Sequence, residues 1–409
     1  RRFLLRGKSL EEKIKFCSNK NFVWVNDTTS REIILKKLDG HIKVLPVLDS
    51  KSKLVNIYTK NYIPAFSEQN IYARSRSPVR ISFGGGGSDL TYFFSAGKGA
   101  VINTTITLYS HAVLKKRNDN KIFLNSFDLK DTLFSNNLND FLKSDGKFKL
   151  IKSLIKTVNP DFGFELYLYS DYPINSGLGG SAATSAAILG CFNEFRTDKW
   201  GDYELAELSY QSERLYLGVS GGWQDQYSTT FGGLNFIEFN YEKNIVHSLR
   251  LNESIENELE ESLILCDTKT VHNSGNIHDD MQKKFLNQDM NKIIESNVKI
   301  CFEMRDHLLR GNLIEFARLL DKAWRIKKTL SKKISNKKLD IIYENAIKNG
   351  ALGGKLLGAG GGGFFLFFVP PFKKFNLIEY LQSEGLSVMP FVFEKKGLKS
   401  WVSRFKKYE

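Results

Sequence analysis

One glycine-rich stretch near the middle of the chain decides its fold: Pro173-Ile174-Asn175-Ser176-Gly177-Leu178-Gly179-Gly180-Ser181-Ala182-Ala183-Thr184-Ser185-Ala186-Ala187. Glycines let the backbone turn with positive φ and approach a ligand with no side chain in the way. The alanine-rich run that follows is a strong helix former. A helix that begins after such a turn presents free N–H groups and the positive end of its dipole. The stretch therefore predicts an anion site suited to nucleotide phosphates.

Other interpretations of this stretch stay open on its residues alone. A glycine turn before a buried helix needs no ligand at all. A dinucleotide-binding loop also fits, because Gly177, Gly179 and Ala182 satisfy G-x-G-x-x-A. The absence of a regular βαβ rhythm around the stretch disfavours that interpretation. A Walker A loop is not present, because Lys355 is followed by Leu356 where that motif has Ser or Thr.

Two further glycine clusters flank the central stretch in sequence. The first is Arg80-Ile81-Ser82-Phe83-Gly84-Gly85-Gly86-Gly87-Ser88-Asp89, and the second is Lys355-Leu356-Leu357-Gly358-Ala359-Gly360-Gly361-Gly362-Gly363-Phe364. In this order and at these spacings, the three motifs resemble those of the GHMP kinases, which include galactokinase, homoserine kinase and mevalonate kinase. The resemblance covers the chain from about Tyr72 to its C-terminus.

Within that superfamily, the chain is most similar to the D-glycero-D-manno-heptose 7-phosphate kinases. The similarity rests on the first and third glycine motifs together with Gly221-Gly222-Trp223-Gln224-Asp225-Gln226-Tyr227 and Phe231-Gly232-Gly233-Leu234-Asn235. Two positions depart from the usual pattern. Gly180 stands where the family's second motif carries the first of two serines, and Ser88 stands where Thr is more frequent. Ser181 is then left as the only hydroxyl ligand of that motif.

The resemblance implies an α+β fold with two kinase lobes. We expect a ribosomal-protein-like N-terminal lobe over residues 72–245 and a ferredoxin-like C-terminal lobe over residues 246–409. A small-residue helix is predicted to start near Gly180, and long helical patterns cover Glu204–Leu217, Asn291–Leu309 and Leu313–Leu330. Strands and helices intermix without a regular alternation, which favours α+β over a doubly wound sheet. A small α/β module would precede the kinase over residues 1–68.

The resemblance also implies the residues that handle ATP and Mg²⁺. Phosphoryl transfer needs positioned phosphates, a metal and an oriented hydroxyl. Ser181 and Glu213 are expected to bind the metal, and Asp225 is the candidate catalytic base. Without the motifs, Glu213 would be read as a salt-bridged helix-surface carboxylate and Asp225 as a helix cap. The expected ATP-binding residues are Pro173, Gly177, Leu178, Gly179, Gly180, Ser181 and Ala182.

The sugar-binding residues are expected in the first motif, and the third motif is expected to close the site beside the phosphates. The expected substrate-binding residues are Arg80, Gly86, Gly87, Ser88 and Asp89, and those of the third motif are Gly358, Gly360, Gly361 and Gly362. Asp89 could equally cap a helix after the glycine turn. Lys98 and Arg74 are weaker candidates for contacting a substrate phosphate. His272 and His278 flank a loop that is expected near the substrate.

Composition limits the partners of this chain. Its 59 Lys and Arg against 45 Asp and Glu give a formal net charge of +14. The densest basic cluster, Lys322 to Lys338, alternates with apolar residues as a solvated helix face does. No zinc-finger, homeodomain or RNA-binding pattern accompanies it, so we expect no nucleic-acid partner. The longest apolar run, Phe364 to Val369, is too short to span a membrane.

The cysteines indicate a reducing compartment. Cys17, Cys191, Cys266 and Cys301 lie far apart and form no C-x-x-C pair. A disulfide framework or a zinc site is therefore not expected, and the cytoplasm is the expected location.

The first seventy residues resemble a single CBS repeat. The pattern predicts short helices at Leu10–Cys17 and Thr29–Asp39, and a hairpin formed by Ile42–Asp49 and Leu54–Thr59. A linker is expected at Pro64–Asn70. CBS repeats work in pairs and often bind adenine nucleotides, so the resemblance implies a homodimer through this module or a second repeat upstream. A decayed spacer is the alternative.

The expected function is an ATP- and magnesium-dependent kinase acting on the anomeric hydroxyl of a heptose 7-phosphate. The 1,7-bisphosphate would feed nucleotide-activated heptose for a surface polysaccharide. A kinase for another sugar, such as fucose or mannose, is an alternative of the same class. A dinucleotide-dependent oxidoreductase and a nucleotide sensor without catalysis are alternatives of other classes.

Overall fold

The computed structural model describes residues 22–29, 31–38, 42–59, 70–270, 277, 280–281 and 288–405. The chain divides into two compact units, one of residues 1–70 with 405–409 and one of residues 71–404. The predicted helix at Leu10–Cys17, residues 64–69 of the expected linker, and the loop histidines His272 and His278 lie outside the described residues.

The N-terminal unit contains a small sheet with one helix. Strand β2 (Val44–Leu48) pairs in parallel with β1 (Val25–Asn26) and antiparallel with β3 (Leu54–Thr59), which confirms the predicted hairpin. Helix α2 (Arg31–Leu38) lies within the expected helical span. The buried core of this unit consists of Val25, Ile34, Leu38, Leu45, Val47 and Tyr58. The resemblance of this unit to a CBS repeat stays a prediction.

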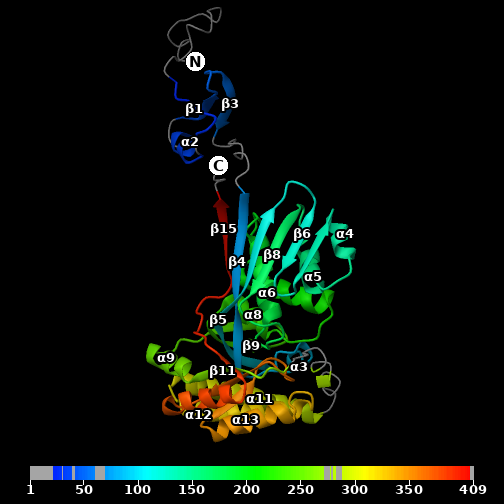
Figure 1. Cartoon of the computed structure of the whole chain (residues 1–409), viewed down its shortest axis with the longest axis vertical. Helices are drawn as coiled ribbons and strands as arrows, with labels where there is room; N and C mark the ends of the chain where they lie inside the picture. Colours follow the sequence, from blue (N-terminus) through cyan, green and yellow to red (C-terminus); the bar gives the residue numbers. More distant parts are fainter. Residues whose placement is uncertain are drawn as a thin grey trace, which may run out of the picture. The chain divides into compact units, whose positions relative to one another are not determined.

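The second unit, residues 71–404, is built around an eight-stranded sheet (Figure 1). Its central strand, β5 (Gly99–Lys116), is long enough to pair with β9 along its first half and with β8 along its second half, while β4 pairs with its other edge. The other strands are β4 (Asn70–Gly84), β6 (Ile122–Ser126), β7 (Asp131–Ser135), β8 (Phe164–Ser170), β9 (Leu234–Phe239), β10 (Asn244–Ser248) and β15 (Lys399–Phe405).

Helices cover this sheet and carry the central glycine stretch. They are α3 (Thr91–Phe94), α4 (Leu138–Lys143), α5 (Lys149–Val158), α6 (Gly180–Asn193), α7 (Asp202–Gln211), the π-helical turn η2 (Ser212–Tyr216) and α8 (Gln224–Phe231). Helix α6 is buried along most of its length because its residues are small, which lets it pack closely against β5. Its predicted start at Gly180 is confirmed.

A second, four-stranded antiparallel sheet has the order β12-β13-β11-β14. Its strands are β11 (Leu263–Asp267), β12 (Gly353–Leu356), β13 (Phe364–Phe368) and β14 (Ser387–Met389). The accompanying helices are α9 (Glu253–Glu261), α11 (Gln288–Leu309), α12 (Leu313–Leu330), α13 (Lys337–Lys348), η3 (Pro371–Lys373) and α14 (Lys374–Ser383). The mixed α/β composition confirms an α+β chain, and the ferredoxin-like description of this lobe stays a prediction.

Strand β13 explains how the two sheets become one body. Successive strand residues point to opposite faces. Phe364 and Leu366 pack in a core cluster with Ile81 and Phe83 of β4, whereas Phe365 packs in a second cluster that includes Trp324 of α12. The apolar run Phe364–Val369 is therefore a strand buried on both faces, as its length indicates.

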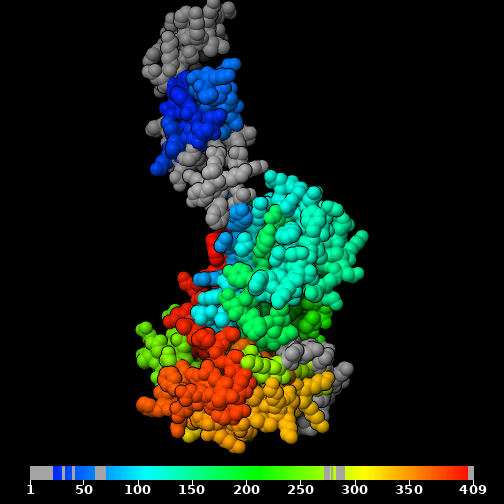
Figure 2. Space-filling model, viewed as in Figure 1, coloured from blue at the N-terminus to red at the C-terminus, as the bar shows by residue number. Residues whose placement is uncertain are grey.

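The end of the chain departs from the expected lobe boundary. Strand β15 returns to the large sheet and pairs with β4, which the sequence did not predict (Figure 2 shows its red residues beside the blue start of β4). The large sheet thus contains residues from both expected lobes. Among the helices of the described ranges, none combines the length and apolar content that crossing a bilayer requires.

Candidate functional site

The central glycine stretch forms a tight loop that leads into α6. Asn175, Gly177 and Gly179 adopt φ values of +62°, +76° and +83°, and Gly179 is the residue that precedes the helix. No side chain caps this end of α6, so its first N–H groups stay available for an anion. The predicted loop before a helix N-terminus is confirmed, and its occupancy by ATP is a proposal taken up below.

The unusual glycine at position 180 has a local cause. A Cβ at Gly180 would lie 2.7 Å from the Tyr172 ring, which covers this side of the helix start. The Tyr172 hydroxyl donates to the Gly180 carbonyl at 3.2 Å and also bonds Ser110. Tyr172 thus occupies the space that a serine side chain would need. Ser181 remains the exposed hydroxyl in the first turn of α6.

The third glycine cluster packs directly on this loop. A Cβ at Gly358 would lie 2.8 Å from Gly177 Cα, and a Cβ at Gly177 would lie 2.9 Å from the Leu357 carbonyl oxygen. The Phe364 amide donates to the Ser176 carbonyl at 3.2 Å. The two loops are therefore in backbone contact, which only residues without side chains permit at these positions.

We expect Gly358→Ala to raise the KM for ATP and to destabilise the fold by about 1–2 kcal/mol or more, because φ at this position is +68° and the methyl group would push against Gly177. Gly385→Ala is the matched control, since Gly385 has φ of +75° and no neighbouring atom within 4 Å of the added Cβ. Steady-state kinetics and thermal melts measure both effects. An equal loss in the two variants would contradict a role for the loop contact.

Arg80 reaches the same loop from strand β4. Val79, Ile81 and Phe83 point into the core, so the alternation of a strand directs Arg80 and Ser82 to the opposite face. The Arg80 guanidinium donates from Nε and Nη2 to the two Asp225 carboxylate oxygens, both at 2.8 Å, and from Nη1 to the Gly177 carbonyl at 2.7 Å. The Arg80 amide also donates to the Leu178 carbonyl at 3.0 Å.

Asp225 lies in the first turn of α8, and it is not the cap of that helix, because Trp223 precedes the helix and no side chain caps it. Asp89 instead supports this helix start. Its Oδ2 accepts from the Gln224 amide and its Oδ1 accepts from the Gly87 amide, each at 3.1 Å. Burial is the largest cause that raises the pKa of Asp89. The capping alternative placed Asp89 at the start of the helix that follows the glycine turn. That helix, α3, starts after Leu90 and has no side-chain cap, so the alternative is wrong and Asp89 contacts the start of α8 instead.

Glu213 is placed by a helical irregularity. The expected helix Glu204–Leu217 instead begins as α7 and continues in the π-helical turn η2, which contains Glu213. Such turns occur often at functional sites. Gln226 donates to Glu213 Oε2 at 2.8 Å, and Arg214 Nη1 lies 3.5 Å from Oε1. Glu213 is buried, so it is not the surface carboxylate of the alternative interpretation.

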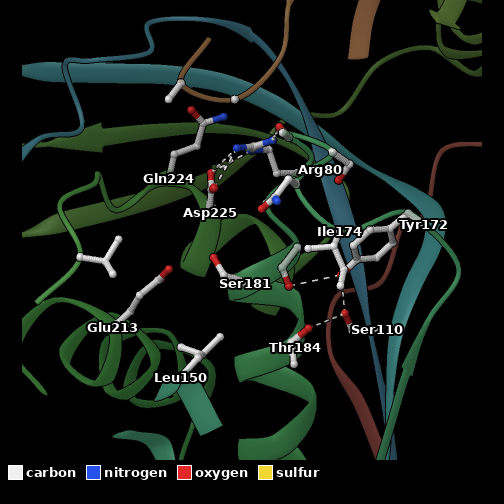
Figure 3. Close-up of a pocket in the computed structure, with 18 of the residues that line it drawn as sticks. Arg80, Ser110, Leu150, Tyr172, Ile174, Ser181, Thr184, Glu213, Gln224 and Asp225 are labelled. Carbon is white, nitrogen blue, oxygen red and sulfur yellow. Dashed lines mark hydrogen bonds and ion pairs between the residues drawn. The ribbon is translucent and has the colours of Figure 1, made fainter. Parts of the chain in front are cut away.

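These groups line one cavity of about 420 Å³. In Figure 3, Ser181, Glu213 and Asp225 point into the same open space, with Arg80 behind Asp225. Apolar side chains also line this cavity, namely Phe148, Leu150, Ile151, Leu168 and Ile174. The predicted residues that line the cavity are Arg80, Gly86, Gly87, Asp89, Gly177, Gly179, Gly180, Ser181, Glu213, Asp225 and Gly358.

Several predicted site residues lie outside the lining: Pro173, Leu178, Ala182, Ser88, Gly360, Gly361 and Gly362. Leu178 and Ala182 are buried in the core. Ser88 is also fully buried, and its hydroxyl bonds the Gly85 and Ala100 carbonyls and accepts from the Ala100 amide. Its hydroxyl therefore holds the first glycine turn together instead of facing a ligand.

The structure also reveals two lysines that the sequence did not assign to the site. Lys327 and Lys355 line the cavity, with 8% and 4% of their surface exposed. Lys327 contradicts the interpretation of Lys322 to Lys338 as a fully solvated helix face. Lys98 and Arg74, the candidates for a phosphate contact, are exposed and do not line the cavity.

The residues present fit a magnesium ion that is shared with a nucleotide. No group of three or more His, Cys, Asp or Glu side chains able to hold a metal occurs in the part of the chain that the structure describes. Mg²⁺ usually takes only one or two protein oxygens and completes its shell with phosphates and water. The Glu213 carboxylate and the Ser181 hydroxyl face the cavity where such an ion would sit.

Comparisons with known proteins agree with this geometry. Residues 148–233 match the model of the GHMP kinases N terminal domain, and residues 304–386 match the GHMP kinases C terminal model. The chain is 39% identical, over 334 residues, to the D-glycero-alpha-D-manno-heptose 7-phosphate kinase of Campylobacter jejuni; this match covers 80% of this chain and 98% of the relative.

Two further relatives extend the comparison. A crystal structure of a D-glycero-D-manno-heptose 1-phosphate kinase from Bacteroides thetaiotaomicron is similar with a TM-score of 0.68 and 31% identity, covering 82% of this chain and all of that one. The L-fucokinase/L-fucose-1-P guanylyltransferase of Bacteroides fragilis is 27% identical, over 74% of this chain and 35% of that protein. With three glycine motifs, an acidic pair and an arginine around one cavity, and with a relative this similar along its whole length, the chain belongs to the GHMP kinase family and is a sugar kinase.

Proposed function

We propose that this protein transfers the γ-phosphoryl group of ATP to the anomeric hydroxyl of a D-glycero-D-manno-heptose 7-phosphate, with Mg²⁺ as the metal. The observation that carries the proposal is the convergence of the α6 N-terminus, Glu213 and Asp225 on one cavity. The named activity of the 39% identical relative supports this acceptor. The product would be the 1,7-bisphosphate, for nucleotide-activated heptose and a surface polysaccharide.

The nucleotide would lie along the loop before α6. The free N–H groups of the first helical turn and the helix dipole favour its phosphates, and the backbone contact between Gly177 and Gly358 shapes the loop around them. The apolar side chains that line the cavity would hold the base. When bound by Ser181 and Glu213, Mg²⁺ would neutralise part of the charge that develops on the transferring group.

The acceptor hydroxyl would lie against Asp225. The oxygen of the acceptor hydroxyl forms a bond to the γ-phosphorus, while the bond from that phosphorus to the bridging oxygen of ADP breaks. Asp225 accepts the hydrogen bond of the hydroxyl, aims its oxygen along this line and takes its proton as the new bond to phosphorus forms. Arg80 holds the Asp225 carboxylate through two hydrogen bonds, so the carboxylate cannot rotate away.

A coupled assay for ADP release over a panel of sugars and sugar phosphates tests the proposal. We expect turnover with the heptose 7-phosphate and little with unphosphorylated sugars. A preference for a free sugar such as L-fucose would favour the second candidate, a kinase for another sugar, which the similarity to the fucokinase supports. A dinucleotide-dependent oxidoreductase is no longer an alternative, because the chain belongs to a kinase family.

We expect Glu213→Gln and Ser181→Ala to raise the Mg²⁺ concentration needed for half-maximal turnover by about tenfold or more, since each removes an oxygen ligand or its charge. Initial rates measured over a magnesium titration at saturating ATP show this shift. Glu207→Gln is the control, because Glu207 lies on the preceding helix and does not line the cavity. Unchanged magnesium dependence in both site variants would remove the metal role.

We also propose that the N-terminal unit is a CBS-like module through which two copies of the chain pair. The described residues of this unit leave many large apolar side chains exposed: Phe22, Val23, Trp24, Ile33, Leu35, Val44, Leu54, Val55 and Ile57. Such a concentration of exposed apolar residues is typical of an interaction surface.

We also propose a cytoplasmic location, which the buried and unbridged Cys191, Cys266 and Cys301 support.

We expect the full chain to sediment as a dimer and to bind AMP or ATP at a second site, whereas a chain that begins at residue 71 should sediment as a monomer and lose that site. Analytical ultracentrifugation and calorimetric titration measure the two properties. A monomeric full chain without a second nucleotide site would leave the segment as a decayed spacer.

A further inference from the structure

Two buried ammonium groups enter the cavity from the C-terminal half of the kinase unit. Lys327 lies on the buried face of α12, one turn from Trp324 and Leu330, and Lys355 lies on β12 in the second sheet. Both line the cavity that contains Arg80 and Asp225. The function proposed above assigns no role to either group.

Neither lysine is paired with a carboxylate within the described residues. Lys327 Nζ donates to the Leu356 carbonyl at 3.2 Å and to the Gly358 carbonyl, which are both neutral acceptors. Its third proton is free for a ligand. Across the described part of the chain, no hydrogen bond or ion pair reaches the ammonium group of Lys355.

The carboxylates nearest to these lysines are already engaged. Both oxygens of Asp225 accept from Arg80, and both oxygens of Asp89 accept from backbone amides. Within the described residues, the two amino groups therefore face the cavity without a compensating negative charge, which makes their charged form costly. Burial, followed by the neighbouring cations, lowers the pKa of Lys355 to about 7 and that of Lys327 well below its ordinary value. An anion that enters the cavity would relieve this cost by forming charge-assisted hydrogen bonds.

The charged neighbours indicate which anion this is. Lys327 lies close enough to Arg80, Asp89 and Asp225 for their charges to act on it, and Lys355 lies close to Arg80 and Asp89. The nucleotide phosphates already have the α6 N-terminus and the metal ligands. Lys327 donates to the Gly358 carbonyl, Gly358 packs on Gly177, and the Gly177 carbonyl accepts from Arg80, which holds Asp225. These contacts place Lys327 beside the pair that would orient the acceptor.

We propose that Lys327 and Lys355 form a phosphate subsite that binds the phosphate group already present on the acceptor sugar and so selects a sugar phosphate over a free sugar. This inference rests on the proposed function, because it assumes a phosphorylated acceptor.

The test uses the full chain with Lys327→Met, Lys355→Met and the control Lys328→Met. Methionine keeps an unbranched side chain of similar length. Lys328 follows Lys327 on α12 but pairs with Asp340 and does not line the cavity. We expect each site variant to raise the KM for the heptose 7-phosphate by at least about tenfold, since each loses a charge-assisted hydrogen bond. The KM for ATP should stay close to that of the wild type, and Lys328→Met should match the wild type in both.

The unphosphorylated heptose provides the second arm. Its slow turnover should be nearly unchanged in the site variants, so that the preference for the phosphorylated acceptor collapses. A raised KM for ATP with an unchanged acceptor KM would show that the anion is the γ-phosphate of the donor, and unchanged constants for both would show a structural role; each result overturns the proposal. Thermal melts show whether a variant has a folding defect. If Lys327→Met has one, Lys355→Met decides between the outcomes, because Lys355 makes no hydrogen bond that the substitution would remove.

Failure of the inference is distinguishable from failure of the proposed function. A wild-type enzyme that phosphorylates only free sugars overturns the proposed function and the subsite with it. A wild-type enzyme that requires the phosphate, together with site variants that keep the same requirement, overturns the subsite alone.

Discussion

Asp225→Asn is expected to lower kcat by about 10²–10⁴-fold, the usual contribution of a positioned base, while the Kd of ATP stays nearly unchanged. The amide keeps the size of the side chain and one acceptor oxygen for Arg80, but it cannot accept a second hydrogen bond at its nitrogen. The loss should therefore appear in the chemical step. Single-turnover kinetics for kcat and calorimetry for ATP binding measure the two quantities separately.

The controls for Asp225 separate charge at a helix start from contact with the acceptor. Asp202→Asn removes the same charge from the first turn of α7, where Asp202 is exposed and does not line the cavity, so its kinetics should match the wild type. Asp225→Ala should also abolish turnover while ATP binding survives. Near-normal turnover in either Asp225 variant would show that the residue does not act on the acceptor.

Arg80→Met is expected to reduce kcat by about 10²–10³-fold, the range measured when a preorganised donor is removed from an active site. It should also destabilise the fold by about 2–4 kcal/mol, because a buried guanidinium that makes three charge-assisted or carbonyl hydrogen bonds is lost. Asp225 would be left without its partner, and the phosphate loop would lose its anchor at Gly177. Denaturant unfolding and steady-state kinetics measure the two losses.

Arg80→Lys tests whether turnover requires the planar guanidinium group of Arg80 or only its positive charge. Lysine keeps the charge but cannot bridge both Asp225 oxygens and the Gly177 carbonyl at once, so we expect an intermediate loss of kcat. Arg117→Lys is the control, since Arg117 also binds both oxygens of an aspartate, Asp119, but does so far from the cavity lining. Equal kinetics for wild type, Arg80→Lys and Arg80→Met would mean that the guanidinium does not position the site.

Local sequence was sufficient for the elements whose signals are short in range. The turn before α6 was predicted because Gly177 and Gly179 precede a run of alanines, and α12 was predicted at its observed bounds, Leu313–Leu330, from its helical periodicity. Such signals depend on the backbone preferences of neighbouring residues, so no distant contact is needed to form them.

The helical periodicity of α12 also predicts that Lys327 is buried, although its charge suggests an exposed position. Lys327 lies three residues from Trp324 and three from Leu330, on the buried stripe of α12. An interpretation by residue type assigned it to the solvated face with its basic neighbours. An interpretation by helical spacing would have placed it inside, where a buried lysine indicates a ligand or a functional role.

Other features of the site depend on contacts that no local pattern encodes. The departure at Gly180 is explained only by the ring of Tyr172, and the irregular turn that directs Glu213 into the cavity appears only in the folded helix pair. Ser88 belongs to the first motif in sequence, yet its hydroxyl forms hydrogen bonds with the carbonyls of Gly85 and Ala100 and does not face the cavity. Membership of a motif therefore did not reveal which side chains face the ligand.

The sequence by itself determined the three glycine loops, because positive φ and missing side chains are properties of single residues. The resemblance of these motifs to a known family then implied an α+β kinase. Only the tertiary structure decided that Arg80 holds Asp225, that Gly177 rests on Gly358, and that Lys327 and Lys355 open onto the same cavity. These pairs are separated by up to 181 positions between Gly177 and Gly358, and only packing of two sheets around a shared core brings them within reach of one another.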